Sequence, residues 1–281
     1  MEIIKTIKEM QQKIEQLKKD GQTIGFVPTM GYLHEGHLTL VEEARKKADI
    51  VIMSIFVNPL QFGPNEDFDR YPRDIERDER LANQAGVNFL FYPEVREMYK
   101  TEMSFHITVK GLADVLCGSN RPGHFDGVAA VLIKLFNIVQ PHFAFFGMKD
   151  AQQVAVVTSL VEQFNFPIEI VPVPTVREED GLAKSSRNVY LLEEERKDAT
   201  VLFQSLQLAK GLIKAGEKNR EKIQSEMKRY INQHSSASID YVEIYTFPDL
   251  KPLQSLSGLV LIAGAIRFTN VRLIDNMTID I

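Results

Sequence analysis

Short apolar runs alternate with helical patterns through the first 175 residues of the chain. The apolar runs, each bounded by polar residues, are 23–27, 50–57, 88–92, 142–146 and 168–173. Between and after them, the spacing of apolar residues predicts helices at 38–48, 74–85, 128–139 and 151–164. Short strands that alternate with helices are typical of an α/β protein whose parallel sheet is covered on both faces. We therefore expect a parallel α/β sheet in this part of the chain.

The pattern changes beyond residue 176. Two long, charged helical segments, 191–215 and 219–234, precede apolar runs at 241–245 and 258–263. Helices followed by strands predict a small α+β domain. We expect one domain at 1–176 and a second at 177–281, with the second covering a site on the first, because crevices between domains commonly bind ligands.

Composition places the chain among ordinary soluble proteins. It has 281 residues, of which 44% are hydrophobic and 25% charged. Residues 1–10 mix charged and apolar residues in helical fashion and lack the apolar core of a secretion signal, and no run approaches the ~18 apolar residues of a membrane span. The net charge of −5 disfavours a nucleic-acid partner. The single cysteine, Cys117, excludes an intrachain disulfide and fits the cytoplasm.

Polar motifs follow the ends of several predicted strands, where open parallel sheets bind ligands. The first motif contains His34, Gly36 and His37 at the start of a helix. Helix N-termini carry unpaired N–H groups and bind phosphate, and a three-residue spacing places both imidazoles on one face. Alternatively, the histidines cap the helix, pack or bind a structural metal. A metal is disfavoured because no compact set of Cys and His lies nearby, so we favour phosphate chemistry.

The second motif, at 56–63, contains Asn58 and Gln61. Their amides can donate to and accept from a hydroxyl or carboxylate. Ordinary turn chemistry is the alternative, since Asn-Pro and Gly-Pro pairs form loops; it stays open for Asn58, whereas Gln61 favours a functional role. We interpret the following stretch, 67–73, as an exposed turn.

The third motif, at 121–128, precedes a helix. The guanidinium of Arg121 matches a phosphate or a carboxylate of a substrate. The alternative is a structural loop, in which Asp126 caps the helix. We interpret His124 and Asp126 as structural and leave both readings open for Arg121.

The fourth motif follows the run 142–146. Gly147 permits close backbone approach, and Asp150 is a suitable helix cap. Lys149 can neutralise phosphate charge as a point cation, with an ordinary surface lysine as the alternative. Gln153 lies one helical turn further on and can face the same crevice.

The fifth motif lies at the expected domain junction and comprises Lys184, Ser185, Ser186 and Arg187. Hydroxyls between cationic residues can clamp a phosphate when a mobile loop brings them in. A plain exposed loop is the alternative. The other histidines, His106, His142 and His234, have no comparable surroundings and are interpreted as structural.

These five motifs together resemble the pantothenate synthetase (pantoate–β-alanine ligase) family. The matching segments, in chain order, are 28–37, 56–63, 121–128, 146–153 and 180–188. The resemblance implies a Rossmann-like, nucleotide-binding parallel-sheet domain of the HxGH nucleotidylyltransferase superfamily, followed by a smaller α+β domain. It also implies a homodimer.

The resemblance implies an ATP-dependent ligase of coenzyme A biosynthesis. Pantoate would attack the α-phosphorus of ATP to give a pantoyl adenylate and pyrophosphate, and the amine of β-alanine would then release pantothenate and AMP. Mg²⁺ would arrive with ATP, and no protein ligand for it is assigned.

The resemblance also implies roles for individual residues. The nucleotide site would comprise Met30, Gly31, Tyr32, Leu33, His34, Glu35, Gly36, His37, Gly147, Met148, Lys149, Asp150, Val176, Lys184, Ser185, Ser186 and Arg187. Phosphate contacts that act in catalysis would come from His34, His37, Lys149, Ser185, Ser186 and Arg187. Gln61 and Gln153 would hold pantoate, and Asn58 and Arg121 remain candidate substrate contacts. The family often has methionine at the position of Lys184, so catalysis is not assigned to this cation.

Two other classes are compatible with the histidine motif alone. A nucleotidylyltransferase would keep the nucleotide in its product. A non-catalytic nucleotide-binding module would bind ATP without releasing pyrophosphate. A class I aminoacyl-tRNA synthetase fits less well, because the chain is short and net acidic.

Overall fold

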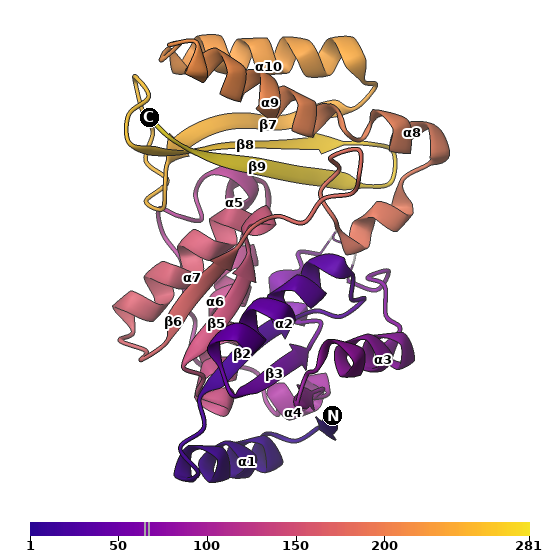
Figure 1. Ribbon diagram of the computed structural model, residues 1–281, viewed down its shortest axis with the longest axis vertical. Helices are drawn as coiled ribbons and strands as arrows, with labels where there is room; N and C mark the ends of the chain where they lie inside the picture. Colours follow the sequence, from indigo (N-terminus) through magenta and orange to yellow (C-terminus); the bar gives the residue numbers. More distant parts are fainter. Residues whose placement is uncertain (65, 67) are drawn as a thin grey trace. The chain divides into compact units, whose positions relative to one another are not determined.

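The computed structural model describes residues 1–64, 66 and 68–281. The chain divides into two compact units (Figure 1). The first unit comprises 1–110, 121–147 and 156–174, and the second comprises 111–120, 148–155 and 175–281. Two short segments, 111–120 and 148–155, thus belong to the second unit although their neighbours along the chain belong to the first.

The first unit contains a six-stranded sheet in which all neighbouring strands are parallel, with the order β1-β4-β3-β2-β5-β6. The strands are β1 (Glu2–Ile4), β2 (Ile24–Thr29), β3 (Ile50–Ile55), β4 (Phe89–Phe91), β5 (Phe143–Gly147) and β6 (Glu169–Val173). The expected parallel α/β sheet is confirmed. The strand order reverses between β2 and β5, and the crevice beyond the carboxyl ends at such a switch point is where open sheets bind ligands.

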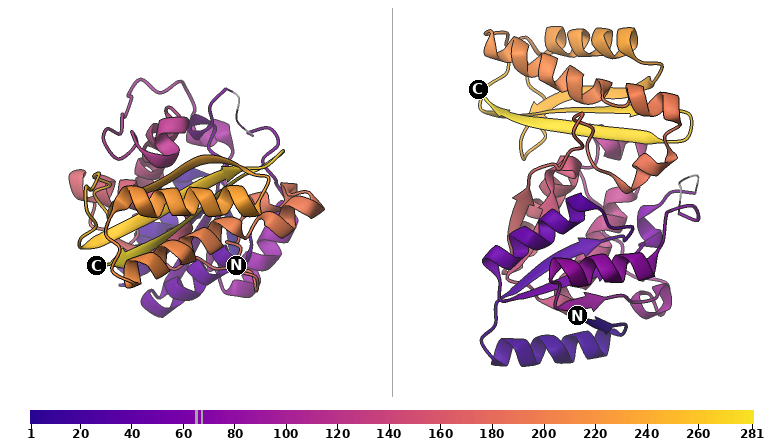
Figure 2. Two further views of the ribbon diagram at one scale, coloured as in Figure 1. Left: turned by 90° about the horizontal axis from the view of Figure 1, so that it is seen from above. Right: turned by 45° about the vertical axis from the view of Figure 1, so that its right-hand side comes forward.

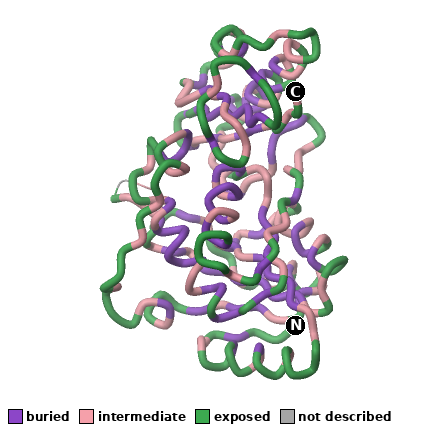
Figure 3. The backbone as a smooth tube through the Cα atoms, turned by 90° about the vertical axis from the view of Figure 1, so that its left-hand side faces the viewer, coloured by how far each residue is buried: buried purple, intermediate pink, exposed green. Residues whose placement is uncertain are grey.

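Helices cover both faces of this sheet (Figure 1). They are α1 (Ile7–Lys19), α2 (Glu35–Lys47), α3 (Ile75–Ala85), α4 (Val95–Met98), α6 (His124–Val139) and α7 (Ala151–Gln163), of which α7 begins in the second unit. On one face, α2 and α3 pack Val41 and Ala82 against Met53 and Leu90 of the strands. On the other, Phe136 of α6 meets Phe26 edge to face. The central strands β2 and β3 are therefore buried, whereas α1 keeps an exposed face (Figure 3).

The second unit contains an antiparallel sheet of β7 (Ser238–Thr246), β8 (Leu259–Arg267) and β9 (Arg272–Asp280), with β8 in the middle. Its helices are α5 (Leu116–Asn120), α8 (Glu193–Asp198), α9 (Val201–Lys214) and α10 (Arg220–His234). Helices α9 and α10 lie side by side on one face of this sheet (Figure 2). The other face packs Leu261 and Ala263 against Leu116 of α5 and Ala151 of α7. The expected small α+β fold is confirmed.

Two predictions about elements were wrong. The N-terminal residues form the short edge strand β1 before α1 begins, although their pattern predicted a helix. Apolar spacing alone did not reveal this strand, since it buries a single residue, Ile4. The segment 191–215 forms two helices, α8 and α9, because the chain turns at Ala199 and Thr200, where both side chains are buried.

Candidate active site

The turn from β2 into α2 has an unusual backbone. Gly31 and Tyr32 both lie in the left-handed region, with φ of 84° and 50°. The Thr29 hydroxyl donates to the Ser54 carbonyl oxygen at 2.8 Å and accepts from the Gly31 N–H at 3.2 Å. A Cβ on Gly31 would lie 3.0 Å from the Asp78 carboxylate. Glycine therefore suits this position both because of its positive φ and because of the limited space. The turn is thereby fixed just before the histidine motif.

The two histidines of this motif are hydrogen-bonded to the helix start. Nδ1 of His34, the N-cap of α2, accepts from the Gly36 N–H at 3.1 Å, and Nδ1 of His37 accepts from the His34 N–H at 3.3 Å. The ring centroids are 4.1 Å apart. A ring nitrogen that accepts an N–H carries no proton, so the neutral rings carry theirs on Nε2. Both rings are thus set as Nε2–H donors, at the positive end of α2.

Capping and phosphate binding are therefore compatible at His34, because the cap uses Nδ1 alone. Leu33 before it is fully buried and anchors the motif in the core, while both imidazoles stay partly exposed. Partly exposed N–H donors at a helix N-terminus suit an anion such as phosphate.

Asn58 and Gln61 form a buried amide pair after β3. Asn58 begins the 3₁₀ turn Pro59–Gln61, and its Nδ2 donates to Gln61 Oε1 at 3.3 Å and to the Gly127 carbonyl at 3.0 Å. The Tyr99 hydroxyl donates to Asn58 Oδ1 at 2.8 Å, and burial raises the pKa of Tyr99, which keeps that proton in place. Gln61 Nε2 contacts the Met30 sulfur at 3.0 Å. The side-chain amide of Asn58 therefore helps to orient the side chain of Gln61, which contacts Met30.

Arg121 is hydrogen-bonded to the turn that contains Gln61. Its Nε donates to Glu66 at 2.7 Å, with a second N–H on the other oxygen, and its Nη1 lies 3.0 Å from His124 Nε2. His124 Nδ1 lies 2.8 Å from the Gln61 carbonyl oxygen. Burial acts to raise the pKa of Glu66, but the Arg121 hydrogen bond and charge outweigh it and hold that pKa below its ordinary value. Arg121 is thus linked to the backbone of Gln61.

The predicted capping role of Asp126 was wrong. Helix α6 begins earlier than expected, at His124, and its N-cap is Gly123. The Asp126 carboxylate instead accepts from the Val109 N–H at 2.8 Å. The exposed turn expected at 67–73 is only partly described, since Asp67 lies outside the described residues. Within it Tyr71 is buried, whereas Asp69, Arg70 and Arg73 are exposed.

In the second unit, Met148, Lys149 and Asp150 form a 3₁₀ turn before α7. Asn276 Nδ2 donates to the Met148 and Lys149 carbonyl oxygens at 2.9 and 2.8 Å, which fixes the turn on β9. Gln152 is buried and bonds the backbone of the segment 112–117. Gln153, the predicted substrate contact, is only half-buried.

The loop from Val176 to Arg187 is anchored within the second unit. The Lys184 N–H donates to the Val176 carbonyl at 2.9 Å, which brings two predicted nucleotide-site segments together. Arg177 pairs with Asp275 at 2.6 and 2.9 Å, and Arg196 binds Glu178 and Asp180. The Arg196 hydrogen bond lowers the pKa of Asp180.

Ser185 and Ser186 lie at the end of this loop. The Ser185 hydroxyl caps the 3₁₀ turn Ser186–Tyr190 by accepting from the Arg187 N–H at 3.3 Å, and Ser186 is buried. Ser185, Ser186 and Arg187 of the predicted phosphate clamp are thereby consecutive residues at the start of one tight turn.

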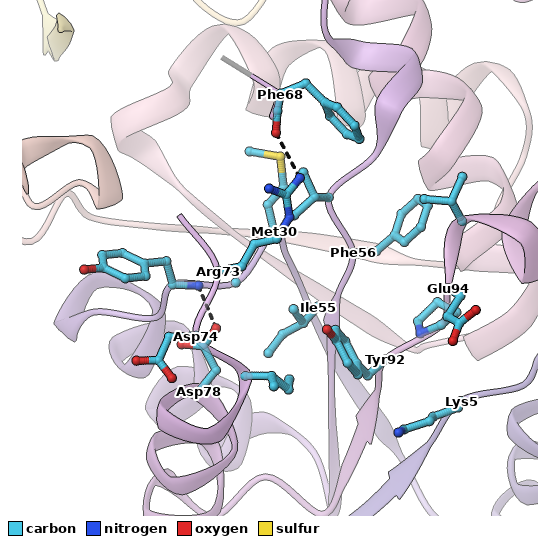
Figure 4. Close-up of a pocket in the computed structure, with 16 residues that line it drawn as sticks. Lys5, Met30, Ile55, Phe56, Phe68, Arg73, Asp74, Asp78, Tyr92 and Glu94 are labelled. Atoms are coloured by element: carbon cyan, nitrogen blue, oxygen red, sulfur yellow. Dashed lines mark hydrogen bonds between the residues drawn. The ribbon is translucent and has the colours of Figure 1, made fainter. Parts of the chain in front are cut away.

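A cavity of about 280 Å³ opens at the carboxyl ends of β2, β3 and β4 (Figure 4). Its lining comprises Lys5, Met30, Gly31, Tyr32, Ile55, Phe56, Val57, Phe68, Arg73, Asp74, Ile75, Asp78, Tyr92, Pro93, Glu94 and Val95. Within the described part of the chain, the cavity therefore adjoins Met30–Tyr32 of the predicted nucleotide site but not the two histidines.

Four residues that hydrogen-bond the predicted site segments were not identified from the sequence. They are Glu66, Asp78, Tyr99 and Asn276. A signal existed for Asp78, because it shares the buried face of α3 with Ala82, and an acidic residue on such a face needs a partner. The other three act through partners distant in sequence, which spacing does not reveal.

A parallel sheet that reverses its order at β2, with two hydrogen-bonded imidazoles at the start of the helix after β2, defines an α/β protein of the nucleotidylyltransferase fold. The family model for pantoate–β-alanine ligase matches residues 2–278, and the chain belongs to this family. It is accordingly a ligase of pantothenate synthesis, which confirms the enzyme class expected from the sequence.

Curated pantothenate synthetases are similar to this chain over nearly its whole length. A pantothenate synthetase of Geobacillus sp. (strain WCH70) is 64% identical over 275 residues, covering 98% of each chain. One from Bacillus cereus (strain ATCC 10987 / NRS 248) is 57% identical over 281 residues, covering 100% of each.

Two solved structures show the same fold. The pantothenate synthetase of Thermus thermophilus has a TM-score of 0.93 at 45% identity, covering 99% of each chain. A pantoate–β-alanine ligase from Francisella tularensis, complexed with β-γ ATP and β-alanine, has a TM-score of 0.79 at 33% identity, covering 99% of this chain and 97% of that one. In the described part of this chain, no helix has the length and apolar character needed to span a bilayer.

Proposed function

We propose that this protein condenses pantoate with β-alanine at the expense of ATP through an enzyme-bound pantoyl adenylate. A pantoate carboxylate oxygen bonds to the α-phosphorus as pyrophosphate leaves. The amine of β-alanine then bonds to the acyl carbon, loses a proton and displaces AMP. Family membership supports the overall reaction, and the Francisella relative complexed with β-γ ATP and β-alanine supports these two substrates.

The observation that carries the adenylation step is the pair of backbone hydrogen bonds to Nδ1 of the two histidines. Because Nδ1 of His34 and of His37 each accepts a backbone N–H, each Nε2 presents a proton to a ligand at the start of α2. Preorganised donors aimed at a phosphate stabilise the charge that develops on it during displacement. We assign both rings as donors to the phosphate oxygens of ATP.

We propose that Gln61 and Gln153 hold pantoate, with Gln61 also near β-alanine. The Gln61 amide is oriented by Asn58 and Met30, and a buried amide that is already oriented binds a hydroxyl or carboxylate with little further ordering. Asn58 and Arg121, for which the sequence leaves a substrate contact open, hydrogen-bond Gln61 and thereby support its turn. Both stay candidate substrate contacts.

The remaining nucleotide contacts are assigned as the family resemblance implies. In the first unit they are backbone and side chains of Met30–His37, together with Gly147. In the second they are Lys149 on phosphate, Asp150 towards the ribose, Val176 towards adenine, and Ser185, Ser186 and Arg187 on the triphosphate. For function, we propose the division expected from the sequence. Residues 1–176 bind ATP and pantoate, and residues 177–281 act as a lid.

Mg²⁺ is proposed to enter as part of the MgATP substrate. Among residues 1–64, 66 and 68–281, no three His, Cys, Asp or Glu side chains group in a way that could hold a metal ion. A site with few protein ligands suits Mg²⁺ that is bound mainly through substrate phosphates. We also propose that the protein is a cytoplasmic homodimer, which sedimentation and cell fractionation would test.

An assay of product formation tests the proposed function. Pantoate and MgATP without β-alanine should give a pyrophosphate burst of one equivalent per site, and adding β-alanine should release AMP and pantothenate together. A nucleotidylyltransferase would instead leave the nucleotide in its final product. A protein that binds ATP but releases no pyrophosphate with pantoate would be a binding module, and the proposal would fail.

A further inference from the structure

The carboxylate of Asp78 is bound to the turn that carries the histidine motif. Asp78 lies on α3, one turn after the N-cap Asp74, and is only 2% exposed. Its Oδ2 accepts from the Tyr32 N–H at 2.7 Å (Figure 4). Its Oδ1 accepts from the Leu33 N–H at 2.7 Å. Both oxygens are therefore used on two successive amides of one turn.

This arrangement suits a carboxylate and no other side chain of similar size. A carboxylate offers two acceptor oxygens in one plane, whereas an amide would set its NH₂ against one of the N–H groups and a hydroxyl has a single oxygen for both. Burial raises the pKa of Asp78, and the bonds from Leu33 and Tyr32 oppose that rise by stabilising the charged form. The Arg77 guanidinium is 3.7 Å away, too far for a hydrogen bond. The two short N–H bonds therefore provide most of the support for the buried charge.

The backbone between these amides and the histidines is short and strained. Tyr32 has a φ of 50°, a region that non-glycine residues enter at a cost and hold only when their surroundings fix them. Leu33 directly precedes His34, the N-cap whose own N–H bonds His37 Nδ1. Moving the Leu33 amide thus moves the cap and, through it, both imidazoles.

We propose that Asp78 is a positioning residue, which holds the left-handed turn at Tyr32 so that His34 and His37 point their Nε2–H groups at the nucleotide phosphates. This inference rests on the proposed function, because the nucleotide is the ligand in question. The Asp78 carboxylate binds backbone N–H groups of the turn. It acts through the backbone, and displacement of a catalytic group by about 1 Å can cost about 10²-fold in rate.

The test compares two Asp→Asn variants on the same helix. Asp78→Asn keeps the shape but sets its NH₂ against one of the two amides. We expect kcat for pantoate-dependent pyrophosphate release to fall about 10- to 100-fold, with the KM values for pantoate and ATP changed by about twofold or less. Asp74→Asn, the matched control, keeps a good N-cap and bonds Arg77 rather than the turn, so its kcat should stay at the wild-type value. Wild-type kcat in Asp78→Asn, or equal losses in both variants, would overturn the proposal.

A spectroscopic readout is independent of turnover. The ¹⁵N chemical shifts of the imidazole nitrogens report which one carries the proton, and we expect His34 and His37 to be Nε2–H tautomers in the wild type and in Asp74→Asn. In Asp78→Asn both should shift towards mixed tautomers, since the N–H groups that bind Nδ1 are displaced. Unchanged tautomers in Asp78→Asn would overturn the positioning role, even if the proposed reaction itself were absent.

If Asp78→Asn does not fold, two glycine variants test the same positioning role. Gly31→Ala places a Cβ 3.0 Å from Asp78 Oδ2, whereas Gly21→Ala adds a Cβ at a similar φ of 72° with nothing within 4 Å. The same loss of kcat and the same tautomer shift are expected in Gly31→Ala alone. Gly31→Ala with wild-type kcat and tautomers would overturn the proposal.

Discussion

His34 has two tasks at the scale of a single residue, and each uses a different ring nitrogen. Nδ1 caps α2 by accepting from the Gly36 N–H, and Nε2 is the proposed donor to phosphate. His37 repeats the arrangement without being the N-cap, since its Nδ1 accepts from the His34 N–H. A capping role and a catalytic role can therefore be separated by the choice of substitution.

His37→Ala should remove one proposed donor and leave the fold intact. Loss of one such donor typically costs ~2.7–4 kcal/mol, or about 10²–10³ in rate. We expect the pyrophosphate burst from pantoate and MgATP to slow by that factor in single-turnover experiments. His106→Ala, the same change at an exposed histidine, should keep the wild-type burst. A burst of wild-type rate in His37→Ala would remove this histidine from the mechanism.

His34→Asn and His34→Ala should differ in stability but not in activity. Asparagine is a good N-cap and alanine a poor one, with a typical difference of about 1 kcal/mol. For a chain of this size we expect His34→Ala to melt roughly 2–4 °C lower, with His34→Asn close to the wild type. Both lack the ring Nε2–H and should slow adenylate formation about 10²–10³-fold. Calorimetry and the burst assay check this, and an active His34→Asn would show that capping alone matters.

At the scale of elements, the alternation of apolar runs and helices predicted the parallel sheet, because strands buried on both faces read as continuous apolar segments. It failed at β1, which buries only Ile4, and at the break between α8 and α9. The motifs after β2, β3 and β5 were found because they are local in sequence. Their supports were missed, since Tyr99 reaches Asn58 across 41 positions and Asn276 reaches Met148 across 128.

Helix α6 and the turn of Gln61 are in close contact through one glycine. A Cβ on Gly127 would lie 2.2 Å from the Leu60 carbonyl oxygen, so Gly127→Ala must displace the turn that carries Gln61. We expect a higher KM for pantoate and a lower melting temperature. Gly211→Ala is the matched helical control, because its Cβ meets nothing within 4 Å. Removal of a helical glycine there should stabilise by about 0.5–1 kcal/mol without changing kinetics. A wild-type KM in Gly127→Ala would argue against Gln61 as a pantoate contact.

At the scale of the whole molecule, the two units are interleaved along the chain. The segments 111–120 and 148–155 lie between parts of the first unit along the sequence, yet they belong to the second unit and complete its core. There Leu116, Ala151 and Ala155 pack with Leu250, Leu261 and Ala263. The motif residues Lys149 and Gln153 thus sit on a segment whose packing partners arrive about one hundred residues later in the chain.

A fragment of residues 1–176 should therefore not reach a compact native state alone. Without β8 it exposes Leu116, Ala151 and Ala155, and exposed apolar surface of this kind binds hydrophobic dyes and promotes association. We expect strong dye fluorescence and a broad urea transition for 1–176, and recovery of a sharp transition with pyrophosphate release when 177–281 is added.

The matched control changes Leu116, Ala151 and Ala155 of the same fragment to serine. It should lower the dye fluorescence without restoring the sharp urea transition, because the packing partners on β8 are still missing. A monomeric 1–176 that unfolds in one sharp transition with no dye bound would show that this fragment folds independently of β8. In that case Lys149 and Gln153 would be held in place by residues 1–176 alone.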